Sequence, residues 1–215
     1  MNLLIDTPPD EVAIGEAVYP IGTGFRTWVL FELLMQDDSV KPVDKAVAAI
    51  DLAFPYGIDG EADAKDVIKA IIWFYKCGRT DKERKLANDN SEKEEDDCYE
   101  PHERAYSFDY DDEYIYAAFL QQYGVNLVTV RDLHWWEFRA MFKGLDHNCE
   151  FAKIMGYRTA KITSDMSKSE KNFLHKMKSI HALPMSQKEY DESNALIEAL
   201  KNGGDVDSLL KGRHS

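Results

Sequence analysis

The stretch from Leu133 to Phe142, which reads LHWWEFRAMF, constrains the fold more than any other part of the chain. At about 100° per residue, large apolar side chains occupy nearly the whole circumference of such a helix, Trp135 and Phe138 on one arc and Trp136 on another. Arg139 lies in the narrow polar strip between them. A helix that is apolar almost all round is usually covered on several sides. We therefore predict that this helix is central and that the other helices pack around it.

The remaining periodicity predicts a mainly α-helical, compact multi-helix domain with a small N-terminal β-hairpin. Short β-branched runs on either side of Gly15-Glu16 indicate the hairpin, and Pro20 confines its second strand to an edge. Helical spacing of apolar residues then predicts helices over residues 24–38, 42–54, 63–77, 109–124, 129–143, 150–155 and 167–183.

Two of these helices carry specific expectations. In the helix that begins at Pro42, the residues Val43, Val47, Ile50 and Phe54 form one apolar stripe, which we expect to face the core. In the helix that follows Ser167, the sequence Ser-Lys-Ser-Glu matches a capping box, in which a serine and a glutamate satisfy the first backbone amides.

An abrupt change in composition interrupts the helical pattern at residues 79–105. This stretch is almost wholly polar, with the acidic run Glu92–Asp97 at its centre, and cannot bury enough apolar surface to offset the entropy of ordering. We predict a disordered acidic loop inside a helical domain of residues 1–184. Residues 185–215 are expected to form a further helix and a loose tail.

Composition excludes several functional classes. The formal net charge of −13 and the isoelectric point near 4.9 argue against general nucleic-acid binding and against adhesion to anionic membranes. No apolar run reaches the roughly 18 residues of a membrane span, and the N-terminus does not resemble a signal peptide. Three widely spaced cysteines indicate reduced thiols. We therefore expect a cytosolic protein with neither nucleic acid nor membrane as its partner.

Sequence motifs for catalysis, metal binding or phosphate binding are weak or absent. His134 and Glu137, three residues apart, could act in acid–base chemistry or ligate a metal, but a zinc site needs about four ligands and no second pair accompanies them. Cys98 and His102 lie in the acidic stretch without further ligands. No phosphate-binding glycine loop or nucleophile motif is present. We assign no catalytic residue, metal or cofactor, and a small enzyme or metalloprotein using His134 and Glu137 is the lesser alternative.

Tyrosines accumulate before the central helix, at positions 106, 110, 114, 116 and 123. Such rings could stack on bases, but few basic residues accompany them, so packing or a protein-binding face is the better interpretation. The residues alone therefore favour a binding or assembly role without naming it.

The blocks DYDDEYIYAAFLQQYG at 109–124 and LHWWEFR at 133–139 resemble the "gene product fifteen" family of bacteriophages with long tails. The resemblance extends to YPI at 19–21, FRTW at 25–28, WFYKCG at 73–78, IMGYR at 154–158 and the Leu-Pro at 183–184. Matched blocks thus run from about residue 12 to residue 200, with the acidic stretch as the main gap.

The resemblance implies a tail-assembly chaperone. Such a protein coats the long helical tape-measure protein, keeps it soluble, and is displaced by the tail-tube protein, so that it acts in the host cytoplasm and is absent from the mature virion. Self-association is also expected. A structural tail component or adaptor is the alternative. The signature residues, with roles in the core or in partner binding, are Phe25, Trp28, Trp73, Phe74, Tyr114, Tyr116, Phe119, His134, Trp135, Trp136, Phe138, Arg139 and Arg158.

Overall fold

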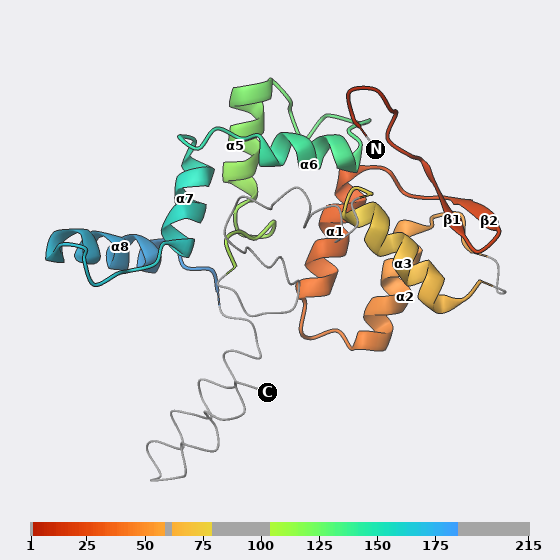
Figure 1. The fold of residues 1–215 in the computed structure, drawn as a ribbon, viewed down its shortest axis with the longest axis horizontal. Helices are drawn as coiled ribbons and strands as arrows, with labels where there is room; N and C mark the ends of the chain where they lie inside the picture. Colours follow the sequence, from red (N-terminus) through yellow and green to blue (C-terminus); the bar gives the residue numbers. More distant parts are fainter. Residues whose placement is uncertain (1, 59–61, 79–103, 185–215) are drawn as a thin grey trace, which may run out of the picture.

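The computed structural model describes residues 2–58, 62–78 and 104–184, and it confirms a mainly helical fold with one two-stranded sheet in this part of the chain (Figure 1). The elements in chain order are β1 (Glu11–Ile14), β2 (Ala17–Pro20), α1 (Phe25–Gln36), α2 (Pro42–Ala53), α3 (Ala64–Tyr75), α5 (Asp112–Tyr123), α6 (Trp135–Lys143), α7 (Glu150–Thr159) and α8 (Lys168–Ile180).

The predicted hairpin is present. β1 and β2 pair antiparallel, with Val12 opposite Tyr19 and Ile14 opposite Ala17, and Gly15 in the turn has a φ of 62°, which favours glycine. Val12 and Ile14 are buried, and β1 packs against α3. This contact supplies the support that an isolated two-stranded hairpin lacks.

The core is a continuous cluster of aromatic rings from α1, α3, α5 and α6. Trp28 is fully buried and stacks on Phe74 and Trp135, at centroid distances of 5.0 and 6.4 Å. Phe138 lies between Phe25 and Phe119, stacked on both at 5.0 Å. The interior therefore forms around the first turn of α6, as the composition of that stretch predicted.

The start of α6 differs from the prediction, because the helix begins at Trp135 and not near Thr129. Residues 126–130 form a turn, in which the side chain of Asn126 accepts hydrogen bonds from the amides of Val128 and Thr129. The guanidinium of Arg26 donates to the backbone carbonyls of Leu127, Val128 and Val130 and holds this turn against α1. The helix that was predicted to end at Met155 continues as α7 to Thr159.

The apolar stripe of α2 reaches the core only at its C-terminal end, where Phe54 is buried and Ile50 packs against the core cluster; the valines at its N-terminal end depart from the prediction. Val43 is 74% exposed and Val47 is 55% exposed, whereas Ala49 and Ala53 are buried. α1 and α3 pack along the alanine side of α2. Small side chains let helices approach closely, which explains why this side and not the valine side meets the core.

Helix α8 forms as predicted but buries nothing. Ser167 Oγ accepts from the amide of Glu170, and the Glu170 carboxylate accepts from the amide of Ser167, which completes the capping box. None of the residues of α8 is buried, and the helix projects from one end of the molecule (Figure 1). None of the described helices is long and apolar enough to cross a membrane.

Two predicted features cannot be compared with the structure. Residues 79–103 of the predicted acidic loop, with Cys98 and His102, and the predicted C-terminal helix and tail at 185–215 lie outside the described residues.

Candidate functional site

His134 is the N-cap of α6, not part of the helix. Its Nδ1 accepts a hydrogen bond of 3.0 Å from the amide of Trp136, and the Glu137 carboxylate accepts one of 3.3 Å from the His134 amide. Because Nδ1 accepts, the neutral ring carries its hydrogen on Nε2, which donates to the carbonyl of Pro9 at 3.1 Å. Both ring nitrogens are thus committed to backbone groups.

These contacts argue against the alternative in which His134 and Glu137 act together at a metal or in catalysis. Burial lowers the pKa of His134 below its ordinary value, consistent with a neutral capping ring. In the part of the chain that the structure describes, no group of three or more histidine, cysteine, aspartate or glutamate side chains is arranged to hold a metal ion.

The two adjacent tryptophans cap the end of a different helix. The indole nitrogen of Trp136 donates to the carbonyl of Phe74 at 2.8 Å, and that of Trp135 donates to the carbonyl of Tyr75 at 3.0 Å. These carbonyls belong to the last turn of α3 and have no amide four residues ahead as a helical partner, although that of Phe74 also accepts from the amide of Cys77. Both tryptophans therefore serve the core, and both indoles complete a helix terminus 60 residues or more away in the chain.

The turn that follows α3 leaves space for these indole rings. The Gly78 amide donates to the carbonyl of Trp73 and the Cys77 amide to that of Phe74, a Schellman arrangement with Cys77 at a φ of 58°. A Cβ on Gly78 would lie 2.7 Å from Cη2 of Trp136. Glycine is therefore required at position 78 both by its φ of 68° and by the close approach of the indole.

Arg158 joins the α5–α6 region to α7 and α8. Its guanidinium makes a bidentate pair with Asp111, at 2.6 and 2.8 Å, and both side chains are buried. It also donates to the carbonyls of Ala105 and His181. Removal of one partner from such a pair leaves an uncompensated buried charge, so the arrangement fixes geometry and offers no free group for chemistry.

A second polar cluster lies between α1, α3 and α6. Glu32 is buried, and its carboxylate accepts a 2.8 Å hydrogen bond from the hydroxyl of Tyr75. Burial raises the pKa of Glu32. The guanidinium of Arg139 lies over the rings of Tyr75 and Trp135, at 5.6 and 5.3 Å from their centroids. The cation at position 139 thus packs against aromatic faces beside a buried carboxyl.

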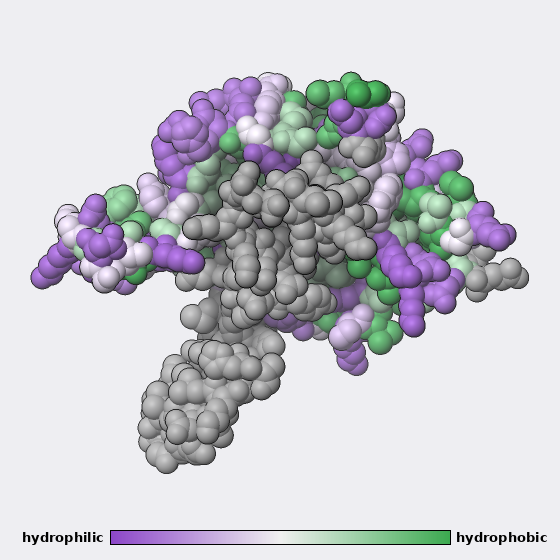
Figure 2. Space-filling view, viewed as in Figure 1, coloured by the Kyte–Doolittle hydropathy of each residue, from purple (hydrophilic) through white to green (hydrophobic). Residues whose placement is uncertain are grey.

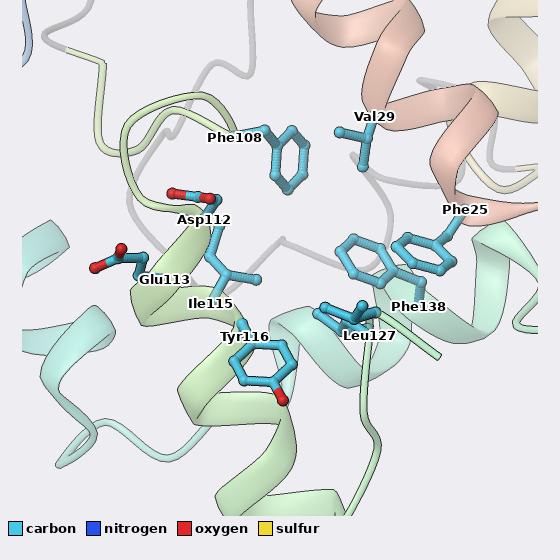
Figure 3. A pocket seen from close by; sticks show the side chains of 10 residues that line it. Phe25, Val29, Phe108, Asp112, Glu113, Ile115, Tyr116, Leu127 and Phe138 are labelled. Atoms are coloured by element: carbon cyan, nitrogen blue, oxygen red, sulfur yellow. The ribbon is translucent and has the colours of Figure 1, made fainter. Parts of the chain in front are cut away.

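The candidate binding site is an apolar pocket of about 500 Å³ between α1, α5, α6 and the segments just before and after α5 (Figure 3). Rings and aliphatic side chains from these segments point into it, and Asp112 and Glu113 lie along one side, with the Glu113 carboxylate directed away from the rings. The lining residues are Phe25, Val29, Phe108, Asp112, Glu113, Ile115, Tyr116, Leu127, Val128 and Phe138. The pocket accepts large apolar groups next to a negative edge.

The structure brings three predicted signature residues to this pocket and places most of the others in the core. Phe25, Tyr116 and Phe138 line the pocket, whereas Trp73 and Tyr114 are 38% and 40% exposed and lie outside its lining. His134 and Arg139 are partly buried. Those that support the core without lining the pocket are Trp28, Phe74, Phe119, Trp135, Trp136 and Arg158.

Several pocket residues escaped prediction. Val29 follows the periodicity of α1, but Phe108 and Leu127 are single apolar residues in connecting segments, where no pattern shows which way they face. Asp111 was hidden among the neighbouring acidic residues that the sequence assigns to the helix N-terminus. Only the packing of the connecting segments against α1 and α6 makes Phe108 and Leu127 recognisable, and only the pairing with Arg158 reveals Asp111, which lies outside the pocket.

Comparison with known proteins yields one assignment. No curated protein and no solved structure matches the chain significantly. The family model described as bacteriophage Gp15 protein matches residues 4–183, which include every element of the fold and the complete pocket. The chain therefore belongs to the bacteriophage Gp15 protein family.

Proposed function

We propose that this protein is a tail-assembly chaperone that binds apolar helical segments of the tape-measure protein during tail morphogenesis and has no catalytic role. Membership of a bacteriophage family supports a task in building the phage particle. The observation that carries the proposal is the apolar pocket lined by Phe25, Phe108 and Phe138.

The geometry of this pocket fits side chains that anchor an amphipathic helix. A volume of about 500 Å³ accommodates one or two large apolar side chains, and a helix presents such groups at i, i+3 or i+4. Aromatic walls tolerate anchors of different shape, which suits a long partner with many similar but non-identical segments. Asp112 and Glu113 favour segments with a basic residue beside the anchor.

The strongly acidic chain supports the same role. A bound layer of molecules that each carry a formal charge of −13 keeps an apolar filament dispersed by mutual repulsion. In this proposal the protein acts in the host cytoplasm while the tail is built, and it is absent from the finished particle because the tail-tube protein replaces it.

Co-expression of the full-length protein with the tape-measure protein of the same phage tests this proposal. We expect the tape-measure protein to become soluble and to co-purify. Val128→Glu should abolish co-purification, because Val128 lines the pocket and is 76% exposed, so that the substitution leaves the fold intact. Leu4→Glu, at a residue that is 94% exposed and outside the pocket lining, is the matched control and should bind normally.

Two results would overturn the proposal. One is a tape-measure protein that stays insoluble beside well-expressed chaperone. The other is stoichiometric presence of the protein in purified virions, measured by mass spectrometry, which would establish a structural tail component or adaptor instead.

A further inference from the structure

Helix α8 presents an incompletely covered apolar face. Phe173 and Ile180 are 50% and 58% exposed, and Met177 lies between them on the same face. The ring of Tyr157 in α7 contacts the edge of Phe173 at a centroid distance of 5.9 Å. An amphipathic helix of 13 residues that buries none of its side chains has a face suited to a partner.

The charge of α8 is opposite to that of the whole protein. The helix contains four lysines and one glutamate, a net charge of 4 − 1 = +3, whereas the whole chain has −13. Lys168 and Lys176 are exposed. The partner that best complements α8 is therefore an acidic surface with exposed aliphatic side chains, and two copies of α8 would repel each other.

Such a surface exists on α2 of the same protein. Val43 and Val47, one turn apart, are 74% and 55% exposed, and Asp44 and Asp51 are exposed along the same side of the helix. Val43 and Val47 are the N-terminal half of the stripe whose periodicity predicted a place in the core. Unlike Ile50 and Phe54, these two valines remain largely exposed within the described chain.

The two faces lie at opposite ends of the molecule. α8 forms one end in Figure 1, and α2 lies with α1, α3 and the hairpin toward the other end. Figure 2 shows hydrophobic residues exposed among hydrophilic ones at both ends. With this placement, α8 of one molecule cannot meet α2 of the same molecule, whereas it can meet α2 of a second one.

We propose that the protein associates head to tail, with the apolar face of the basic helix α8, flanked by Lys176, docked on the Val43–Val47 face of α2, flanked by Asp44 and Asp51, in a second copy of the chain. Each association leaves one α8 face and one α2 face unoccupied, so the contact is heterologous and can continue into an open chain of molecules. It uses neither the pocket nor the tape-measure protein.

Sedimentation velocity of the full-length protein alone tests the proposal over a wide range of concentrations. The mean mass should rise with concentration and fall as salt is added, because the lysines and aspartates are solvent-exposed. Ile180→Glu and Val47→Glu remove one face each and should raise the dissociation constant by about tenfold or more. Circular dichroism and thermal unfolding like those of the wild type show that both variants are folded.

A mixture of the two variants gives the decisive result. Ile180→Glu retains its α2 face and Val47→Glu retains its α8 face, so an equimolar mixture should form a dimer and nothing larger. Association of Val47→Glu alone to the same extent as the wild type, failure of the mixture to pair, or a wild type that stays monomeric at every concentration would overturn the proposal. Val128→Glu should associate normally, which separates this contact from cargo binding.

Discussion

Helices α6 and α8 show how little an amphipathic pattern says about what a helix packs against. α8 has 13 residues and a capping box formed by Ser167 and Glu170, yet none of its residues is buried. α6 has nine residues and contributes three side chains that are 2% exposed or less, Trp135, Trp136 and Phe138. α8 is therefore held by its own hydrogen bonds and by contacts with the neighbouring helix α7, whereas α6 is held by distant parts of the chain.

The largest difference in stability between substitutions in the two helices is expected when a large aromatic side chain is replaced by alanine. Trp135→Ala removes a fully buried indole and its hydrogen bond to the carbonyl of Tyr75, and we expect it to lower the free energy of unfolding by about 3–5 kcal/mol. Phe173→Ala on α8, where the ring is half exposed, should cost under about 1 kcal/mol. Urea denaturation followed by tryptophan fluorescence measures both, and equal losses would contradict the comparison.

A substitution at Trp136 can separate the stability contributed by the indole hydrogen bond from that contributed by the size of the ring. Trp136→Phe keeps an aromatic ring but removes the donor to the carbonyl of Phe74, so we expect a loss of about 1–3 kcal/mol. Trp73→Phe, at a ring that is 38% exposed, is the matched control and should cost less. Equal costs in chemical denaturation would show that the indole cap of α3 contributes nothing.

The cap of α6 should give stability a dependence on pH. Burial lowers the pKa of His134 in the folded state, so its contribution is complete above the unfolded pKa near 6.5 and is lost as the pH falls through the folded pKa. His134→Ala should cost about 1 kcal/mol at neutral pH. The free energies of unfolding of the wild type and of His134→Asn, which retains an acceptor but does not titrate, should diverge as the pH falls below about 6.5, as denaturation at a series of pH values measures.

If the difference in free energy of unfolding between wild type and His134→Asn does not change with pH, the neutral ring of His134 does not contribute in this way. The raised pKa of Glu32 acts in the opposite direction, since it destabilises the folded state as the pH rises. Glu32 is present in both proteins, so its effect cancels in the comparison.

The smallest effect belongs to the cap of α8. Ser167→Ala should change the global free energy of unfolding by less than about 0.5 kcal/mol, because α8 opens without the core. Amide hydrogen exchange in α8 should nevertheless accelerate severalfold while exchange in α6 is unchanged. Acceleration in both helices would mean that α8 unfolds together with the aromatic core.

Features governed by local rules could be predicted from the sequence. The hairpin turn at Gly15, the capping box at Ser167 and the termination of α5 at Gly124, with a φ of 65°, all depend on residues within a few positions of each other. The central place of the tryptophan run followed from its apolar circumference.

Features decided by neighbouring elements could not be predicted. The stripe of Val43 and Val47 has the periodicity of a core face, but the contact with α1 and α3 follows the alanines instead. His134 was assigned to the helix interior because nothing local shows that Thr23 would pair with the start of α6. The pocket is formed by five segments, two of them without periodicity, so no local pattern could predict it.

The backbone contact between the starts of α1 and α6 also determines how much the length of the chain between these helices can vary. Gly24 pairs with His134, and Arg26 reaches the carbonyl of Val130, 104 residues away. Closure of so long a loop is entropically costly, but the cost grows only logarithmically, by roughly 0.6 kcal/mol for each doubling of the loop. Dozens of residues could therefore be inserted into the acidic stretch after α3, or about a dozen removed from it, with little change in stability, provided that both ends still reach the aromatic core.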